Sequence, residues 1–122
     1  MSTTINYNLE ERTGKFGEQI IELCKNLKPN IISTPIINQL VKSATSIGAN
    51  YMEANGASSK KDFKNKIFIC KKEAKETKHW LRMLLKCIPD KQETILNLSQ
   101  ECHELILIFS KIIISLNLKI KN

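Results

Sequence analysis

The stretch SKKDFKNKIFICKKEAKETKHWLRMLLKCI, from Ser59 to Ile88, decides the fold. Apolar or small side chains recur in it at alternating steps of four and three residues, at Phe63, Ile67, Cys70, Ala74, Thr77, Leu81, Leu84 and Ile88. Those steps keep the side chains on one edge of a helix, facing neighbouring helices. The stretch therefore predicts a single helix, about 43 Å long at 1.5 Å per residue, whose apolar edge lies in the core of a bundle.

The remaining surface of this helix carries the charge of the chain. Residues 60–91 hold eleven Lys/Arg and four Asp/Glu, a net +7, and the whole chain, with 19 Lys/Arg and 12 Asp/Glu, is also +7. The basic face of the helix, as we define it, consists of Lys60, Lys61, Lys64, Lys71, Lys72, Lys75, Lys78, Arg82 and Lys86. Such a stripe attracts a phosphate backbone through counterion release, although lysines on a helix often form only a solvated surface.

Length and composition limit the fold class. A chain of 122 residues fits one domain, residues 1–122, that buries about two-thirds of its unfolded surface. Aromatic residues make up 6%, and Gly and Pro together number seven, which favours helices over a sandwich or barrel. We expect helices at about 9–27, 35–55, 59–88 and 90–118, after a polar arm at 1–8. Short links force neighbours to run antiparallel, so the prediction is an all-α, up-down-up-down four-helix bundle.

Local signals mark the expected helix ends. Thr34 is predicted as an N-cap with Pro35 at the first helical position. Gly56 is predicted as a left-handed C-cap, and Ser59, with Asp62 three residues later, as the cap of the long helix.

Polar residues run beside the apolar edges of the two central helices. They form a predicted structural network of Ser43, Ser46, Asn50, Glu53, Glu73 and Glu76. Polar side chains in such places bond a neighbouring helix and fix its register, and a functional pocket is the alternative. We expect Glu53 to be held by amides at the start of the next helix, or by Lys60, Lys61 or Lys64. Trp80 either stacks on a base or packs against the bundle.

The last predicted helix is apolar on more than one side. Its inner edge is expected to be Ile95, Leu98, Cys102, Leu105, Phe109, Ile112 and Leu116. That register leaves an apolar surface elsewhere, which predicts a homo-oligomer interface at Leu107, Ile108, Ile113 and Ile114, unless the register is slightly shifted.

Motifs for catalysis or metal binding are weak. Glu76 and His79 form one E-x-x-H pair, whereas a di-iron bundle needs two, and Gln100 precedes His103 by three residues. No G-x-S-x-G turn or Gly-rich phosphate loop is found. We therefore expect no enzymatic activity, no metal and no cofactor.

Cysteine use and hydropathy indicate the compartment. The four cysteines lie in predicted helices without a C-x-x-C pair, so we expect buried free thiols. No secretory segment is visible, and the apolar run from Leu105 to Leu118 is interrupted by Ser110, Lys111, Ser115 and Asn117. These features predict a cytoplasmic protein that does not bind a membrane.

The segment SATSIGANYMEANGASSKKDF at 43–63, followed by KKEAKETKHWLRML at 71–84, resembles the bacterial four helix bundle protein family, the 23S rRNA intervening-sequence proteins. The resemblance is carried by Ser46-Ile47-Gly48-Ala49-Asn50, Glu53, Gly56, Phe63 and Glu76-Thr77. It implies a small all-α subunit that assembles into a ring, typically a pentamer, with no enzymatic activity. A related branch, the accessory variability determinant of diversity-generating retroelements, binds nucleic acid and a reverse transcriptase.

Charge and resemblance together predict a non-catalytic, oligomeric bundle that binds nucleic acid, RNA in particular, through the basic face. With 17 Lys and 2 Arg the chain has little capacity for bidentate base recognition, so binding should be weakly sequence-specific. The alternative is a scaffold that docks an acidic protein partner, such as a reverse transcriptase-type protein.

Overall fold

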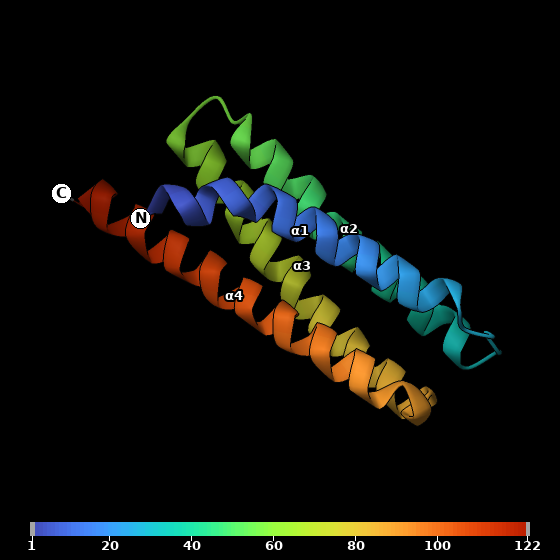
Figure 1. Cartoon of the computed structure of the whole chain (residues 1–122). Coiled ribbons are helices and arrows are strands. Elements are labelled where there is room, and N and C mark those ends of the chain that lie inside the picture. Colours follow the sequence, from blue (N-terminus) through green and yellow to red (C-terminus); the bar gives the residue numbers. More distant parts are fainter. Residues whose placement is uncertain (1, 122) are drawn as a thin grey trace.

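The computed structural model describes the backbone of residues 2–121 and the side chains of residues 8–118. Its elements are four α-helices, with one short 3-10 turn, η1, before the last: α1 (Ser2–Lys25), α2 (Ser33–Asn55), α3 (Lys60–Cys87), η1 (Pro89–Lys91) and α4 (Gln92–Lys121). In Figure 1 the α1–α2 and α3–α4 turns lie at one end, opposite the α2–α3 turn. The described chain is thus an all-α, up-down-up-down four-helix bundle, as predicted.

Helix α3 lies at the centre of the packing. It contacts α2 and α4 extensively and α1 packs against α2, whereas α1 and α4 have the smallest contact among the neighbouring helices. The ribbons of α1 and α4 separate toward the end that holds the α1–α2 turn (Figure 1). The bundle is therefore tightest around α3 and loosest between its first and last helices.

The core follows the apolar edge of α3. The side chains of Ile67, Cys70, Ala74, Thr77, Leu81 and Leu84 are all buried. The spacing of four and three residues predicted this edge correctly because it stays in phase with the helix over its whole length. The core also contains the rings of Tyr51 on α2 and Phe109 on α4, whose centroids lie 6.5 Å apart.

Helix α1 begins at Ser2, so the prediction of a polar arm at residues 1–8 is wrong for residues 2–8. Leu9 is only 1% exposed and Thr13 and Phe16 are buried, which anchors the first half of this helix in the core. Gly48 brings α2 close to α1 there, because a Cβ at Gly48 would lie 3.4 Å from the carbonyl of Thr13.

The signals at the helix ends were only partly right. Ser59 caps α3 as predicted, its Oγ accepting from the Asp62 amide at 3.0 Å. Thr34 is not the cap of α2: the Asn30 carboxamide oxygen accepts from the amides of Ile32 and Ser33, both at 2.9 Å. The Asn30 side chain therefore satisfies two amides at the start of α2. Thr34 does not cap them, because α2 already begins at Ser33 and Thr34 lies within the helix.

Gly56 is not left-handed, since its φ is −95°. Its amide bonds to the Glu53 carbonyl at 3.1 Å, three residues back, so a tightened last turn ends α2 instead. At the other loop, η1 occupies Pro89–Lys91, and α4 begins at Gln92 rather than at 90.

The register of α4 departs from the prediction near its end. Ile95, Leu98, Cys102, Leu105 and Phe109 are buried, but the next buried residue is Ile113, and Ile112 and Leu116 are only partly buried. After Phe109 the buried edge advances by four residues instead of three, which a 3.6-residue repeat allows.

Candidate nucleic-acid interface

The basic face lies outside the core edge of α3. Lys60, Lys61, Lys72, Lys75, Arg82 and Lys86 are exposed, and Lys64, Lys71 and Lys78 are partly buried. In the described part of the chain none of these nine side chains forms an ion pair with a carboxylate. Among the described residues, these cations therefore have no direct carboxylate partner.

One border of the basic face meets α4. The Lys78 ammonium lies 3.0 Å from Nδ1 of His103. An ammonium can only donate, so in this contact Nδ1 is the acceptor, which corresponds to the tautomer with the ring proton on Nε2. No acceptor among the described residues is bonded to that Nε2, which leaves a donor beside the basic face.

A groove of about 580 Å³ runs along this border, and we call it the α3/α4 groove. Its rim carries Lys75, Lys78 and Arg82. The described residues that line it include no Asp or Glu, and the others are His79, Leu81, Leu85, Ile95, Leu96, Ser99, His103 and Ile106. The groove thus combines a cationic rim with an apolar floor.

The α2 border of α3 differs, because its lysine is paired. Lys66 donates to Glu53 Oε1 at 2.7 Å, and this hydrogen bond raises the pKa of Lys66. The predicted partners of Glu53, which were Lys60, Lys61, Lys64 or the first amides of α3, are therefore wrong. The tightened end of α2 places Glu53 beside the second turn of α3 rather than its first.

The predicted polar network consists of separate contacts. The Thr77 hydroxyl lies 2.9 Å from Ser43 Oγ and 2.8 Å from the Glu73 carbonyl, so a buried hydroxyl pair links α2 to α3. The Asn50 amide donates to the carbonyl and Oγ of Ser46 within its own helix, at 2.8 and 2.9 Å.

Glu73 and Glu76 have no side-chain hydrogen bond within the described residues, so the structure does not join them to the other network residues. Burial, and secondarily the Glu76 charge, raises the pKa of Glu73. The fold therefore disfavours the ionised form of the Glu73 carboxyl group.

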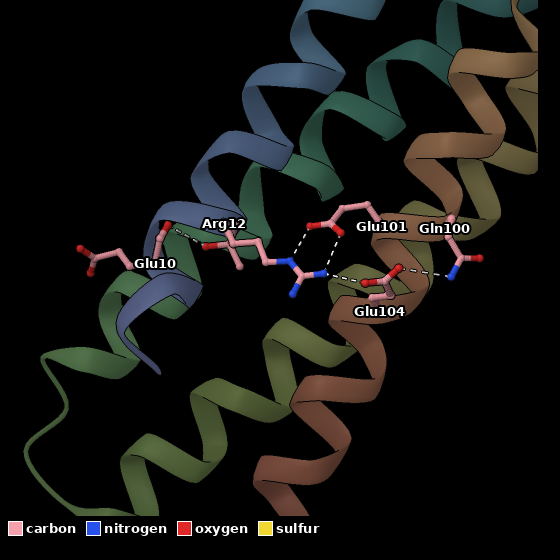
Figure 2. Close-up of polar contacts among 6 residues, drawn as sticks. Glu10, Arg12, Gln100, Glu101 and Glu104 are labelled. Atoms are coloured by element: carbon pink, nitrogen blue, oxygen red, sulfur yellow. Dashed lines mark hydrogen bonds and ion pairs between the residues drawn. The ribbon is translucent and has the colours of Figure 1, made fainter. Parts of the chain in front are cut away.

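A second ionic contact, which sequence reasoning missed, connects α1 to α4. Arg12 donates from Nε to Glu101 at 2.7 Å and from its terminal Nη2 to Glu101 at 2.8 Å and Glu104 at 2.9 Å (Figure 2). These bonds raise the pKa of Arg12. Arg12 and Glu101 are 89 positions apart, so no local pattern in the sequence indicates the pair.

Trp80 packs rather than presenting its ring to solvent. It is partly buried against the core, and His79 stands edge-on to it with centroids 4.8 Å apart. Its buried Nε1 has no hydrogen-bond partner among the described residues. His79 itself is exposed, and the described residues contain no group of three side chains suited to a metal ion.

The cysteines are free, and two of them are buried, as predicted for Cys70 and Cys102. Burial raises the pKa of each of these two thiols to about 12. Cys24 and Cys87 are only partly buried.

The predicted oligomer residues fall into two groups. Leu107 and Ile114 are 54% and 59% exposed, and Ile108 is partly buried. Ile113 is 6% exposed and packs in the core of the subunit, so the structure does not place it on the outer surface.

Among the described residues, no helix contains an apolar segment long enough to cross a membrane.

The profile of the 23S rRNA-intervening sequence protein family matches residues 6–111. The chain belongs to this family. A crystal structure from Bacteroides thetaiotaomicron VPI-5482, described as a protein with unknown function from the S23 ribosomal protein family, aligns at a TM-score of 0.76 with 31% identity. The alignment covers 85% of this chain and 96% of that one. None of the curated proteins matches the chain.

The family membership confirms the resemblance identified in the sequence, and the aligned structure agrees with the bundle. Neither finding concerns retroelement accessory proteins, so that part of the resemblance stays a prediction.

Proposed function

We propose that this family member is a non-catalytic protein that binds RNA through the basic face of α3. The observation that carries the proposal is the set of nine cationic side chains without a carboxylate partner in the described structure. A phosphate backbone would supply the missing negative charges and release its counterions. The family's description, which refers to 23S rRNA, favours RNA over other polyanions.

Binding of this kind is set by backbone charge more than by base sequence. Eight of the nine residues are lysines, which act as point charges rather than as planar bidentate donors. Affinity should therefore depend steeply on salt and weakly on sequence.

Self-assembly would strengthen such binding. The exposed side chains of Leu107 and Ile114 offer an apolar contact for a second subunit. A ring, as the resemblance implies, would present several basic faces to one RNA and raise avidity without any new contact.

An acidic protein surface is the second candidate partner, because the same unpaired cations would attract it. RNA is the leading candidate because of the family description. A competition experiment between RNA and an acidic protein tests which of the two binds more tightly.

The test is fluorescence anisotropy with a structured RNA hairpin at physiological salt. A variant with Lys71, Lys75, Lys78 and Arg82 changed to Glu should lose about 100-fold or more in affinity. The matched control changes Lys15, Lys28, Lys91 and Lys111 to Glu, all exposed residues outside α3, and should lose far less. Equal losses in the two variants would contradict binding through α3.

A further inference from the structure

We infer that the α3/α4 groove receives the base of an unpaired nucleotide, with the phosphates on either side of it on Lys75, Lys78 and Arg82. This inference rests on the proposed RNA binding and adds a substrate class to it: RNA with bulged or single-stranded nucleotides is preferred over continuous duplex. Three features of the groove carry the inference.

The first feature is the row of cations along the rim. Lys75, Lys78 and Arg82 follow one another at steps of three and four residues, so they lie on one side of α3. The row extends about 10 Å along the helix axis, which is close to the length of three nucleotides at about 3.4 Å each. A linear polyanion fits such a row better than a single anionic group does.

The second feature is the apolar floor. Leu81 and Ile95 are almost fully buried at its base, and Leu96 beside them is 47% exposed. The flat face of a base covers apolar surface of this kind, whereas a paired base inside a helix has no free face to offer. The volume of about 580 Å³ is within the usual range for a small-ligand site.

The third feature is the pair of imidazoles. His79 is exposed at the edge of the groove and gives an aromatic ring for stacking. His103 faces Lys78 through Nδ1 and keeps its Nε2 proton for an acceptor on the base or the phosphate. Both imidazoles line the groove, whereas the Trp80 ring packs against the core and does not line it.

The grooves between α1 and α4 do not share these features. Glu22 lines one of them, beside the single cation Lys91. The other has Arg12 and Lys15 on α1, but Glu101 lines it too and pairs with Arg12. Compared with these two grooves, the α3/α4 groove is the one that suits an anionic strand.

The decisive experiment is photocrosslinking of the full chain to two RNA hairpins that differ only in a short bulge of unpaired uridines. One bulge uridine is replaced by 4-thiouridine, and crosslinked peptides are identified by mass spectrometry. We expect crosslinks to peptides containing His79, Leu96 or His103, and about tenfold tighter binding of the bulged hairpin. Equal binding of the two hairpins, or crosslinks confined to other peptides, would overturn the groove assignment but not the proposed function. Failure of both hairpins to bind would overturn both.

Two uncharged variants in the groove and one matched control outside it separate the groove from general electrostatics. Ser99→Leu narrows the groove and should reduce the preference for the bulge while duplex affinity stays within about twofold. Asn97→Leu, on the opposite side of α4, is the matched control and should keep the preference. Leu96→Ala, at a half-exposed site where folding is not at risk, should reduce the preference a few-fold. If all three variants keep the full preference, the base lies elsewhere and the inference is wrong.

An anionic lipid could also combine charge with apolar contact. Vesicles of phosphatidylglycerol are therefore tested in parallel. Tight vesicle binding that Ser99→Leu removes, together with an unchanged bulge preference in that variant, would assign the groove to lipid and overturn the inference.

Discussion

The two sides of α4 differ in whether the cations that face them are paired with carboxylates. On the α1 side, Arg12 is neutralised by Glu101 and Glu104. On the α3 side, Lys78 contacts an imidazole nitrogen of His103, and Lys75 and Arg82 have no carboxylate partner among the described residues. On the α1 side of α4 the cation therefore serves a contact between helices, whereas on the α3 side the cations stay available to a partner.

Packing explains why the α1 side needs its ion pair. Helices α1 and α4 have the smallest contact among the neighbouring helices, so a forked guanidinium–carboxylate contact adds attraction where packing is limited. Helices α3 and α4 share the buried core, and their junction is held without ion pairs among the described residues. That junction is therefore free to carry positive charge toward a partner.

The largest expected effect comes from making the α3 side resemble the α1 side. Ser99→Glu combined with His103→Glu places two carboxylates opposite Lys75, Lys78 and Arg82. RNA affinity should fall about 100-fold, because the new carboxylates both pair with the cations and repel phosphate. Anisotropy titration measures this. The neutral pair Ser99→Gln with His103→Gln is the control, and an equally large loss there would mean that shape, not charge, is responsible.

The next effect concerns the α1 side. Arg12→Gln should lower the free energy of unfolding by about 1–2 kcal/mol, because it removes a partly buried, forked contact and leaves two carboxylates close together. Urea unfolding followed by circular dichroism measures it. Lys25→Gln, which breaks an exposed 3.8 Å pair with Glu22, should cost less than about 0.5 kcal/mol. RNA affinity should change little in Arg12→Gln; a large loss would place Arg12 in the binding surface.

A smaller effect is expected at the hydroxyl pair that joins α2 to α3. Thr77→Val keeps the side-chain shape but removes the buried hydroxyl, at a cost of about 1 kcal/mol in unfolding free energy. Thr45→Val is the control, since the Thr45 hydroxyl is exposed and bonds only to its own helix. Equal costs in the two variants would show that the link between the helices adds nothing.

The smallest effect is a pH dependence at Glu73. The fold raises the pKa of Glu73 above its ordinary value of 4.5. The free energy of unfolding therefore decreases as the pH rises from about 4.5 through the folded-state pKa, because the fold disfavours the ionised carboxylate. Glu73→Gln should therefore stabilise the protein at pH 7 by up to about 0.5 kcal/mol, and the gain should disappear below pH 4.5. Thermal melts at the two pH values measure it. A gain that persists in acid would indicate an effect of packing rather than ionisation.

The sequence predicted best where one periodic signal dominates. The edge of α3 repeats without interruption, and all six of its central members are buried. In α4, Ile112 and Ile113 are equally apolar neighbours, so the sequence could not determine which of them the helix would turn inward. Ser59 acts within its own turn and was predicted correctly, whereas the Asn30 cap depends on the path of the loop.

The candidate site was predicted in part for a related reason. Net charge identified the basic face, because lysines off an apolar edge lie on the surface. The α3/α4 groove, the contact of Lys78 with His103 and the pairing of Arg12 with Glu101 each join helices through residues that are distant in the chain. Tertiary packing decides such contacts, and a single sequence carries no signal for them.

The salt dependence of RNA binding tests whether the basic face of α3 holds the RNA. For each protein, the logarithm of the association constant is plotted against the logarithm of the salt concentration. The unchanged protein should give a steep negative slope. Changing Lys71, Lys75, Lys78 and Arg82 to Glu should reduce its magnitude by about 3, at roughly 0.7 for each single-strand phosphate that these residues no longer neutralise. The same slope for both proteins would contradict the claim that the basic face of α3 holds RNA.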